Sequence, residues 1–417
     1  MTRLLWLVEL LLAIVASNVS ASNYRELVGH QIWKLDSRMK SKMPSQMMSE
    51  GLLDILDHSG PSNQVRVMPK HVETVNKIFK NEGITYEVII DDLAAYFESE
   101  ELKDRARRDV TEEQEACTES RCTKPLKTQY MTFQQMEWYL QNLNDSQHRK
   151  IDISSIGKSH ENRDIWLVHI KSDNASARSV WVEGGLHARE WISPAVAFGL
   201  IDNILNNEEM TSNFDFFIAP MVNPDGYEYS WTNDRMWRKN RRDNEGRCDG
   251  VDLNRNWDFH FGVGASSYPC SETYMGPSAF SEPETQALRD AMTNRKDNLT
   301  LILSLHSYGQ DLLYPWGWSH LVAAPNKEEL IAAGNIFADG AKRDGGHTYS
   351  VINSAGGMYY ASGATDDWAL GVLKTKYVYT LELRDDGKRG FTLSTEDIDP
   401  CLKEVWNGLR KLLEHIA

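Results

Sequence analysis

Two histidines and one glutamate occupy positions where their side chains could hold a metal ion. His187 and Glu190 belong to the run His-Ala-Arg-Glu, and His306 lies far downstream at the end of an apolar run. Two imidazole nitrogens and one carboxylate form a ligand set of catalytic zinc sites, which leave a fourth position open for water. A His-x-x-Glu pattern is short, so the prediction depends on the residues that accompany it.

A further set of residues could bind a carboxylate or move a proton. The run Trp237-Arg-Lys-Asn-Arg241 holds two arginines, and Asn254 precedes Arg255. Arginine binds carboxylates through paired hydrogen bonds, to which an adjacent asparagine can add a directional donor. Tyr359 lies in a loop between glycines, and Glu382 ends an apolar run, where burial can raise its pKa and suit it to general-base chemistry. Each residue alone fits an ordinary structural role, such as an ion pair, but with the metal ligands they describe one pocket.

The elements that must position the two histidines are strands. Residues 179–185 precede His187 and residues 299–305 precede His306, and both segments are nearly continuous apolar runs. Such runs are typical of buried strands, and ligand sites in α/β sheets gather beyond the ends of strands. We therefore expect both histidines to project from strand ends.

From residue 132 onward the pattern alternates strands with helices. The expected strands are residues 163–171, 180–184, 214–222, 299–306 and 376–383, before a final helix that begins near Asp397. This alternation implies an α/β sheet covered by helices on both faces.

Three further segments precede this part of the chain. Residues 1–21 have the basic start, the mostly apolar run and the small residues of a secretory signal peptide; a membrane anchor is the alternative, but the run is too short to span a bilayer. Residues 22–98 read as a small α+β domain, with strands near residues 30–35, 53–57, 64–68 and 86–90 and a helix over 71–81. Residues 99–127 are polar and charged, as in a linker, and contain the cluster Arg105-Ala-Arg-Arg108.

Composition and charge limit the class of protein. With 417 residues, 41% of them hydrophobic and 25% charged, the chain suits a large catalytic domain plus a smaller one. The net charge of −15 argues against nucleic acid and anionic membrane surfaces as partners. The five cysteines fit an oxidising compartment, and we expect Cys248 and Cys270, which flank a loop-rich stretch, to form a disulfide. Cys117, Cys122 and Cys401 leave one thiol over, and their pairing stays open.

Several motifs together resemble the zinc carboxypeptidases of the pancreatic A/B type, including their proenzyme organisation. Four runs are similar to the catalytic signatures of that family: His187-Ala-Arg-Glu190, Asp252-Leu-Asn-Arg-Asn-Trp257, Leu305-His-Ser-Tyr308 and Thr380-Leu-Glu-Leu-Arg384. Two more are similar to its propeptide, Val28-Gly-His-Gln31 and Gln64-Val-Arg-Val67. The match runs in order along nearly the whole chain after the signal peptide, which makes it specific. A zinc endopeptidase would instead show His-Glu-x-x-His, which the sequence lacks.

The resemblance implies a fold and a zinc site. It implies a mixed, mostly parallel twisted sheet with helices on both faces over residues 128–417, preceded by an inhibitory propeptide domain. One Zn²⁺ would be bound by His187, Glu190 and His306. Glu382 would be the general base and acid, and Arg241 would stabilise the oxyanion. Cys248 and Cys270 match a disulfide common in the family.

The same resemblance implies how a substrate is held. Asn254, Arg255 and Tyr359 would bind the terminal carboxylate of a peptide or protein, with Arg189 and Arg238 in further subsites. Such a site accepts only a chain end, which makes the enzyme an exopeptidase. A non-catalytic binding protein on this fold is an alternative, but it would need a lost ligand or base, and none is missing.

Asp366 determines which terminal residue we expect the enzyme to remove. The resemblance puts Asp366 at the base of the side-chain pocket, where an acid pairs with lysine or arginine and an apolar residue would favour phenylalanine or leucine. In the alternative, Asp366 faces solvent and only Asp367 is structural. Ala364 stands where the family often has glycine, and it could narrow the pocket. We expect a preference for lysine and arginine, with the A-type preference for aromatic or aliphatic residues as the alternative.

The proenzyme organisation implies activation by another protease. Candidate cuts follow Arg108, which suits a dibasic-specific convertase, or Arg121, which lies nearer the mature start in the family. We expect a secreted, extracellular monomer whose partners are this activating protease and the C-termini of its substrates.

Overall fold

The computed structural model describes residues 24–36, 43–56, 64–99, 117–118, 121–122, 129–146 and 150–417. The expected signal peptide, the cluster that ends at Arg108 and most of the expected linker lie outside these residues. In the part of the chain that is described, no helix combines the length and the apolar character needed to cross a bilayer.

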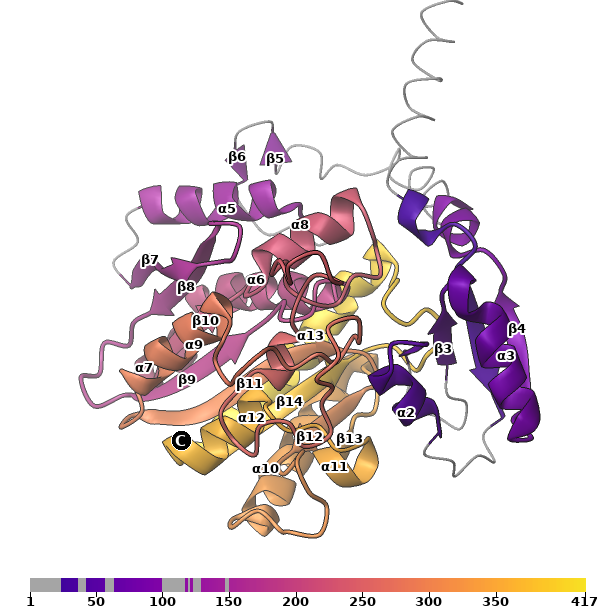
Figure 1. Ribbon diagram of the computed structural model, residues 1–417. Coiled ribbons are helices and arrows are strands. Elements are labelled where there is room, and N and C mark those ends of the chain that lie inside the picture. The colour runs from indigo at the N-terminus through magenta and orange to yellow at the C-terminus, as the bar shows by residue number, and fades with distance from the viewer. Residues whose placement is uncertain are drawn as a thin grey trace, which may run out of the picture.

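A mixed eight-stranded sheet forms the centre of the larger domain, in the order β13-β12-β14-β11-β9-β10-β8-β7 (Figure 1). Its strands are β7 Ile151–Lys158, β8 Asp164–Ile170, β9 Arg178–Glu183, β10 Phe214–Ala219, β11 Leu299–Ser307, β12 Asp311–Tyr314, β13 Ser350–Asn353 and β14 Tyr377–Leu383. Neighbours are parallel in the pairs β9–β10, β9–β11, β11–β14 and β12–β13, and antiparallel in β8–β10, β7–β8 and β12–β14. The expected mixed, mostly parallel sheet is confirmed.

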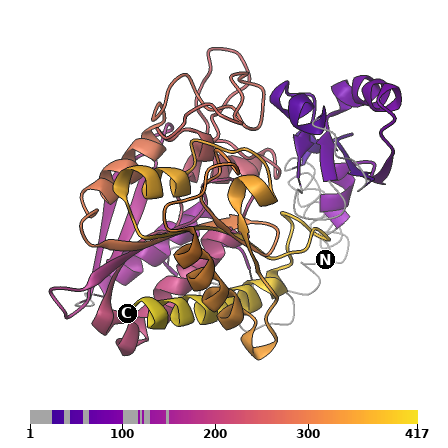
Figure 2. The same ribbon diagram turned by 90° about the horizontal axis from the view of Figure 1, so that it is seen from below.

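Helices cover both faces of this sheet, as expected (Figure 1). The helices are α5 Phe133–Asp145, α6 Ile192–Leu205, α7 Glu208–Asn213, α8 Pro224–Thr232, α9 Pro283–Thr293, α10 Lys327–Ala341, α11 Ser354–Gly357, α12 Thr365–Trp368 and α13 Ile398–Ile416. Helix α13 packs against both α10 and α6, and Figure 2 shows α13 running along one face. Gly199 of α6 permits a close approach, because a Cβ there would lie 2.4 Å from Leu402 Cδ2 of α13.

The five strands expected in the larger domain are all present, although Phe214–Ala219 ends before the expected residue 222. Strands β9 and β11 lie in the middle of the sheet, which explains their continuous apolar sequences, since both of their faces are covered. They are parallel neighbours, so their carboxyl ends meet at one edge. That edge carries His187 and His306. Strands β7, β12 and β13 were not expected from the sequence.

The smaller domain is α+β, as expected. Its four-stranded antiparallel sheet has the order β2-β3-β1-β4. The elements are β1 Gln31–Leu35, α2 Met43–Ser49, β2 Asp54–Ile55, β3 Gln64–Val67, α3 Val72–Asn81 and β4 Tyr86–Ile90, and residues 93–99 are helical. Trp33, Val65, Val67 and Phe79 form part of its own core.

The smaller domain packs against the larger one (Figure 2). Leu27 and Phe97 share an apolar cluster with Met236, Tyr308 and Phe391 of the larger domain. This contact places the short strand β2 over the edge of the large sheet that carries the histidines.

Three of the five cysteines have a defined state among the described residues. Cys248 and Cys270 form the expected disulfide. Cys401 is a free thiol buried in α13. Cys117 is the register partner of Cys122 where β5 Cys117–Thr118 pairs with β6 Arg121–Cys122.

Candidate active site

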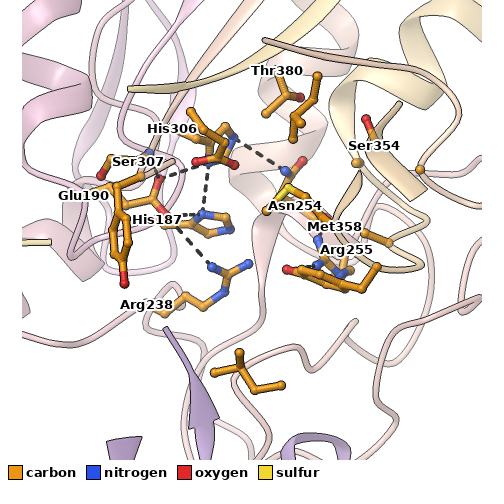
Figure 3. Close-up of a pocket in the computed structure, with 18 of the residues that line it drawn as sticks. His187, Glu190, Arg238, Asn254, Arg255, His306, Ser307, Ser354, Met358 and Thr380 are labelled. Atoms are coloured by element: carbon orange, nitrogen blue, oxygen red, sulfur yellow. Dashed lines mark hydrogen bonds and ion pairs between the residues drawn. The ribbon is translucent and has the colours of Figure 1, made fainter. Parts of the chain in front are cut away.

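A pocket at the carboxyl ends of β9, β11 and β14 gathers nearly all of the candidate residues (Figure 3). Of the residues expected in the site, the pocket lining includes His187, Arg189, Glu190, Arg238, Asn254, Arg255, His306, Tyr359, Asp366 and Glu382. Arg241 is absent from it. The segments that meet here are separated by long stretches of sequence, and the sheet brings them together.

The three expected metal ligands converge on one another (Figure 3). His187 Nδ1 lies 2.8 Å from Glu190 Oε1, His306 Nδ1 lies 3.0 Å from Glu190 Oε2, and the two Nδ1 atoms are 3.1 Å apart. All three residues are buried. Zinc holds such nitrogen and oxygen ligands at about 2.0–2.2 Å, so atoms clustered this closely fit one bound ion.

Electrostatics favours the ligating forms of His187 and Glu190. Burial lowers the pKa of His187, and the charge of Arg238 lowers it further, which favours the neutral imidazole. Although burial opposes ionisation of Glu190, His187 and His306 hold its pKa well below its usual range. A neutral imidazole and an ionised carboxylate are the states that bind a metal.

Asp252 orients this cluster, a role that was not expected from the sequence. Its Oδ1 lies 3.0 Å from His187 Nε2, and its Oδ2 accepts a hydrogen bond from Arg238 Nη2 at 2.9 Å. The carboxylate can only accept, so His187 carries its proton on Nε2 and leaves Nδ1 free for a metal. The sequence did offer one indication that Asp252 belongs to the site, because it lies in the same run as Asn254 and Arg255.

The expectation that Arg241 lies in the pocket is wrong. Its guanidinium pairs with Asp249 at 2.9 Å and lies over the rings of Tyr229 and Trp237, outside the pocket lining. Arg238 points into the site instead, with Nη1 3.9 Å from Glu190 Oε1. The two arginines lie three residues apart in an irregular segment. Arg238 pairs with Asp252 at the pocket, whereas Arg241 pairs with Asp249 outside it.

Asn254 and Arg255 lie together in the pocket (Figure 3), and Tyr359 lines it with them. Arg255 Nη2 donates to Tyr359 Oη at 3.0 Å, and Arg255 Nη1 donates to the carbonyl of Asn254 at 2.7 Å. The buried Nε of Arg255 has no hydrogen-bond partner among the described residues. An arginine with an unused donor beside an amide and a phenol can bind a carboxylate.

Glu382 lines the same pocket from β14, where it is the register partner of His306. Burial raises the pKa of the Glu382 carboxyl to about 8, against the opposing charge of His306. The alternative role as a partner for Arg384 does not apply, because Arg384 pairs with Asp397 at 2.9 Å and with Glu404. Glu382 is therefore available to exchange a proton.

Asp366 and Asp367 are both buried, so the alternative that Asp366 faces solvent is wrong. Asp366 lines the pocket beside Ala364 and is 3% exposed. Asp367 accepts the backbone N–H groups of Gly317 at 2.8 Å and Trp318 at 2.9 Å, which fixes the adjacent loop. Burial raises the pKa of Asp366, and no lysine or arginine of the described residues forms an ion pair with it.

Residues 54–56 of the smaller domain cover the mouth of the pocket, which the sequence did not indicate. Asp54 forms an ion pair with Arg189, and Ile55 and Leu56 line the pocket itself. Arg66 of β3 lies 3.0 Å from Glu272 Oε1 and 3.5 Å from Asp234 Oδ2 of the larger domain. Buried charges of both domains therefore meet beside the site.

Comparison with known proteins identifies relatives of both parts of the chain. A family model described as zinc carboxypeptidase matches residues 136–408, and one described as carboxypeptidase activation peptide matches residues 33–100. Carboxypeptidase B of Astacus astacus is 35% identical over 290 residues, which cover 68% of this chain and 95% of that protein. Carboxypeptidase A2 of Mus musculus is 34% identical over 362 residues, 84% of each.

A solved structure resembles both domains. The carboxypeptidase A from Helicoverpa armigera superposes with a TM-score of 0.83 at 27% identity, over 93% of this chain and 97% of that one.

Replacing His306 with alanine should abolish retention of zinc, because it removes one of three ligands. Metal analysis of the purified variant after dialysis checks this. His320→Ala, which changes a histidine outside the cluster, is the control and should keep one zinc per chain. Stoichiometric zinc in His306→Ala contradicts the ligand assignment.

Proposed function

The chain belongs to the zinc carboxypeptidase family and carries that family's activation peptide, and from this premise we propose that it is a secreted exopeptidase that releases C-terminal lysine and arginine. The observation that carries the preference for basic residues is Asp366, a buried carboxylate that lines the pocket and forms no ion pair with a lysine or arginine of the described residues. The relatives of this chain include both A and B carboxypeptidases, so they do not decide between basic and apolar C-terminal residues. The proposed preference for lysine and arginine depends on Asp366.

Recognition of the chain end is assigned to Asn254, Arg255 and Tyr359. The free Nε of Arg255 and the adjacent amide and phenol can surround the two oxygens of a terminal carboxylate. An internal peptide segment has no carboxylate to offer, so it would leave these donors unpaired in a buried site. The enzyme is therefore restricted to the last peptide bond.

Bond cleavage is assigned to Glu382 and Arg238. A zinc ion held by His187, Glu190 and His306 would supply a Lewis acid that lowers the pKa of water and polarises a carbonyl. Glu382, with its raised pKa, accepts a proton from the attacking water and returns it to the nitrogen of the leaving amine. Arg238, held by Asp252, donates to the oxyanion that forms on the carbonyl oxygen. This role passes to Arg238 because Arg241 lies outside the pocket.

Latency is assigned to the smaller domain. We assign residues 1–21 to a signal peptide, 22–98 to the propeptide domain, 99–127 to the activation segment and 128–417 to the catalytic domain. In the uncleaved chain, Asp54 forms an ion pair with Arg189, and Ile55 and Leu56 fill the mouth of the pocket. An activating protease would cut after Arg108 or Arg121 and release this cover from a monomeric enzyme.

The net charge of −15 favours neither nucleic acid nor an anionic membrane as a partner.

Replacing Arg238 with alanine should lower kcat by about 10²–10³, since it removes a donor to the oxyanion. Arg241→Ala is the matched control and should leave kcat within a few-fold, because that side chain pairs with Asp249. Steady-state kinetics on the activated enzyme measures both. A larger loss in Arg241→Ala would return the oxyanion role to that residue.

Peptides that end in Arg, Lys, Phe or Leu test the preference directly. The activated enzyme should show the highest kcat/KM with the basic pair, because an apolar side chain leaves Asp366 buried and unpaired. Asp366→Ala should reduce kcat/KM for the basic pair by about 10²–10³-fold and spare the apolar pair. A native enzyme that favours Phe or Leu would refute the proposed specificity.

The uncleaved chain should be nearly inactive on peptides of several residues, and Asp54→Ala should raise that residual activity by loosening the cover. Glu73→Ala, at an exposed acid of α3 in the same domain, is the control and should change nothing. N-terminal sequencing of the active form distinguishes a cut after Arg108 from one after Arg121. Full activity in the uncleaved chain would overturn the assignment of latency.

A further inference from the structure

The two central strands that lead to the metal ligands stop pairing just before the ligands begin. The parallel register of β9 and β11 runs as far as Glu183 and Ser304. Gly184 and Gly185 then follow β9 outside the strand, and Gly185 has a φ of +69°, a left-handed conformation that favours glycine. Backbone pairing between β9 and β11 therefore ends where the site starts.

The hydroxyl of Ser193 joins the two strand ends beyond that point. Its Oγ accepts a hydrogen bond from the N–H of Gly185 at 2.9 Å and donates one to the carbonyl oxygen of Leu305 at 2.6 Å. A hydroxyl has one hydrogen and two lone pairs, so one side chain can make both bonds. Ser193 thus continues, through its side chain, the connection that the backbones of β9 and β11 no longer make.

Both hydrogen bonds are enclosed by protein. Ser193 and Leu305 are 0% exposed, and Gly185 is buried as well. Water cannot replace a partner that a buried N–H group loses, so removal of the hydroxyl carries the full cost of an unsatisfied donor. The two strand ends are therefore held firmly at this point.

Helix α6 supplies Ser193 from its first turn, immediately after the turn that carries Glu190. The N–H of Ser193 donates to the carbonyl oxygen of Glu190 at 3.0 Å, and the N-cap residue Trp191 makes no capping hydrogen bond with its side chain. Gly184 lets the helix approach this closely, because a Cβ there would lie 3.1 Å from the carbonyl oxygen of Ser193. The start of α6 is thus fixed against the end of β9.

The contacts of Ser193 lie next to all three metal ligands. Gly185 lies two residues before His187, and Leu305 directly precedes His306. The third ligand, the glutamate just described, is bonded to Ser193 through the backbone. The two histidines face each other in Figure 3, with their Nδ1 atoms 3.1 Å apart.

We propose that Ser193 is a positioning residue of the zinc site, whose hydroxyl fixes the separation of the strand ends that carry His187 and His306. This inference rests on the proposed function, in which one zinc ion is held by these histidines and Glu190. Residues that orient metal ligands typically change metal affinity by about 10–100-fold when they are replaced. Ser193 contacts backbone groups, so it acts on the ligands through the position of the chain.

Zinc affinity separates this role from a purely structural one. A serine that only stabilised the start of α6 would, when lost, lower the stability of the fold and leave the Kd for zinc unchanged. A serine that positions the ligands weakens zinc binding in a chain that still folds.

The purified full-length chain, loaded with zinc, tests the proposal by competition with a chelator of known zinc affinity. Ser193→Ala should raise the Kd for zinc by about 10–100-fold, because it removes both hydrogen bonds. A native Kd in this variant overturns the proposal.

Ser159→Ala is the matched control. This buried hydroxyl makes the same two kinds of bond, since it accepts the N–H of Arg163 at 2.9 Å and donates to Asp225 Oδ1 at 2.7 Å. Its contacts lie with those two residues and not with the metal ligands. The control should keep the native Kd for zinc.

Ser193→Thr and Ser193→Val separate the hydroxyl from the shape of the side chain. Threonine and valine are similar in shape, and valine carries a methyl group in place of the hydroxyl. The threonine variant should bind zinc with a Kd close to the native one, whereas the valine variant should raise it about tenfold or more. Equal Kd values in the two variants contradict a role for the hydroxyl.

The native chain provides a test without any substitution. After zinc has been removed, the amide of Gly185 should still exchange slowly with deuterium, because its bond to Ser193 Oγ does not involve the metal. Fast exchange at Gly185 in the zinc-free chain would mean that the metal orders the strand ends, and it refutes the proposal even if the variants do not fold.

The outcomes separate this inference from the proposed function. Native zinc affinity in Ser193→Ala removes the positioning role and leaves the three ligands standing. Stoichiometric zinc in His306→Ala removes the ligand set on which both depend. The Kd for zinc is measured without a peptide, so neither result depends on which C-terminal residue the enzyme releases.

Discussion

The buried carboxylate of Asp252 joins three functional parts of the site. It meets His187 Nε2, the guanidinium of Arg238 and the backbone N–H of Asn254. A carboxylate without any exposed surface must be hydrogen-bonded or paired to remain ionised, and these partners satisfy it while it fixes their positions. The orientation of His187, of Arg238 and of the segment that carries Asn254 thus depends on one side chain.

The central part of this arrangement was predictable from the sequence, because it follows from the sheet. Apolar runs before His187 and His306 indicated buried strands, and the ends of parallel strands meet at one edge. The choice between Arg238 and Arg241 was not predictable, because both lie in an irregular segment without periodicity. Only the contacts with Asp252 and Asp249 separate them. Strands β12 and β13 were missed because four residues carry too little pattern. The cover formed by Asp54 and Leu56 depends on docking between domains, which no local pattern records.

Arg189 links the two states of the protein. In the uncleaved chain its guanidinium is paired with Asp54 and lies over the ring of Phe391. The same guanidinium would line a substrate subsite once the smaller domain leaves. One positive charge cannot pair with Asp54 and with a substrate at the same time, so under the proposed function the two would compete for Arg189.

The ion pairs of Arg66 have a consequence for how the two domains stay together. Arg66 belongs to the smaller domain, whereas its partners Glu272 and Asp234 belong to the larger one. The loss of either acid would leave a buried arginine with less compensation. A change of charge on one side of this interface must therefore be matched on the other for the two domains to stay docked.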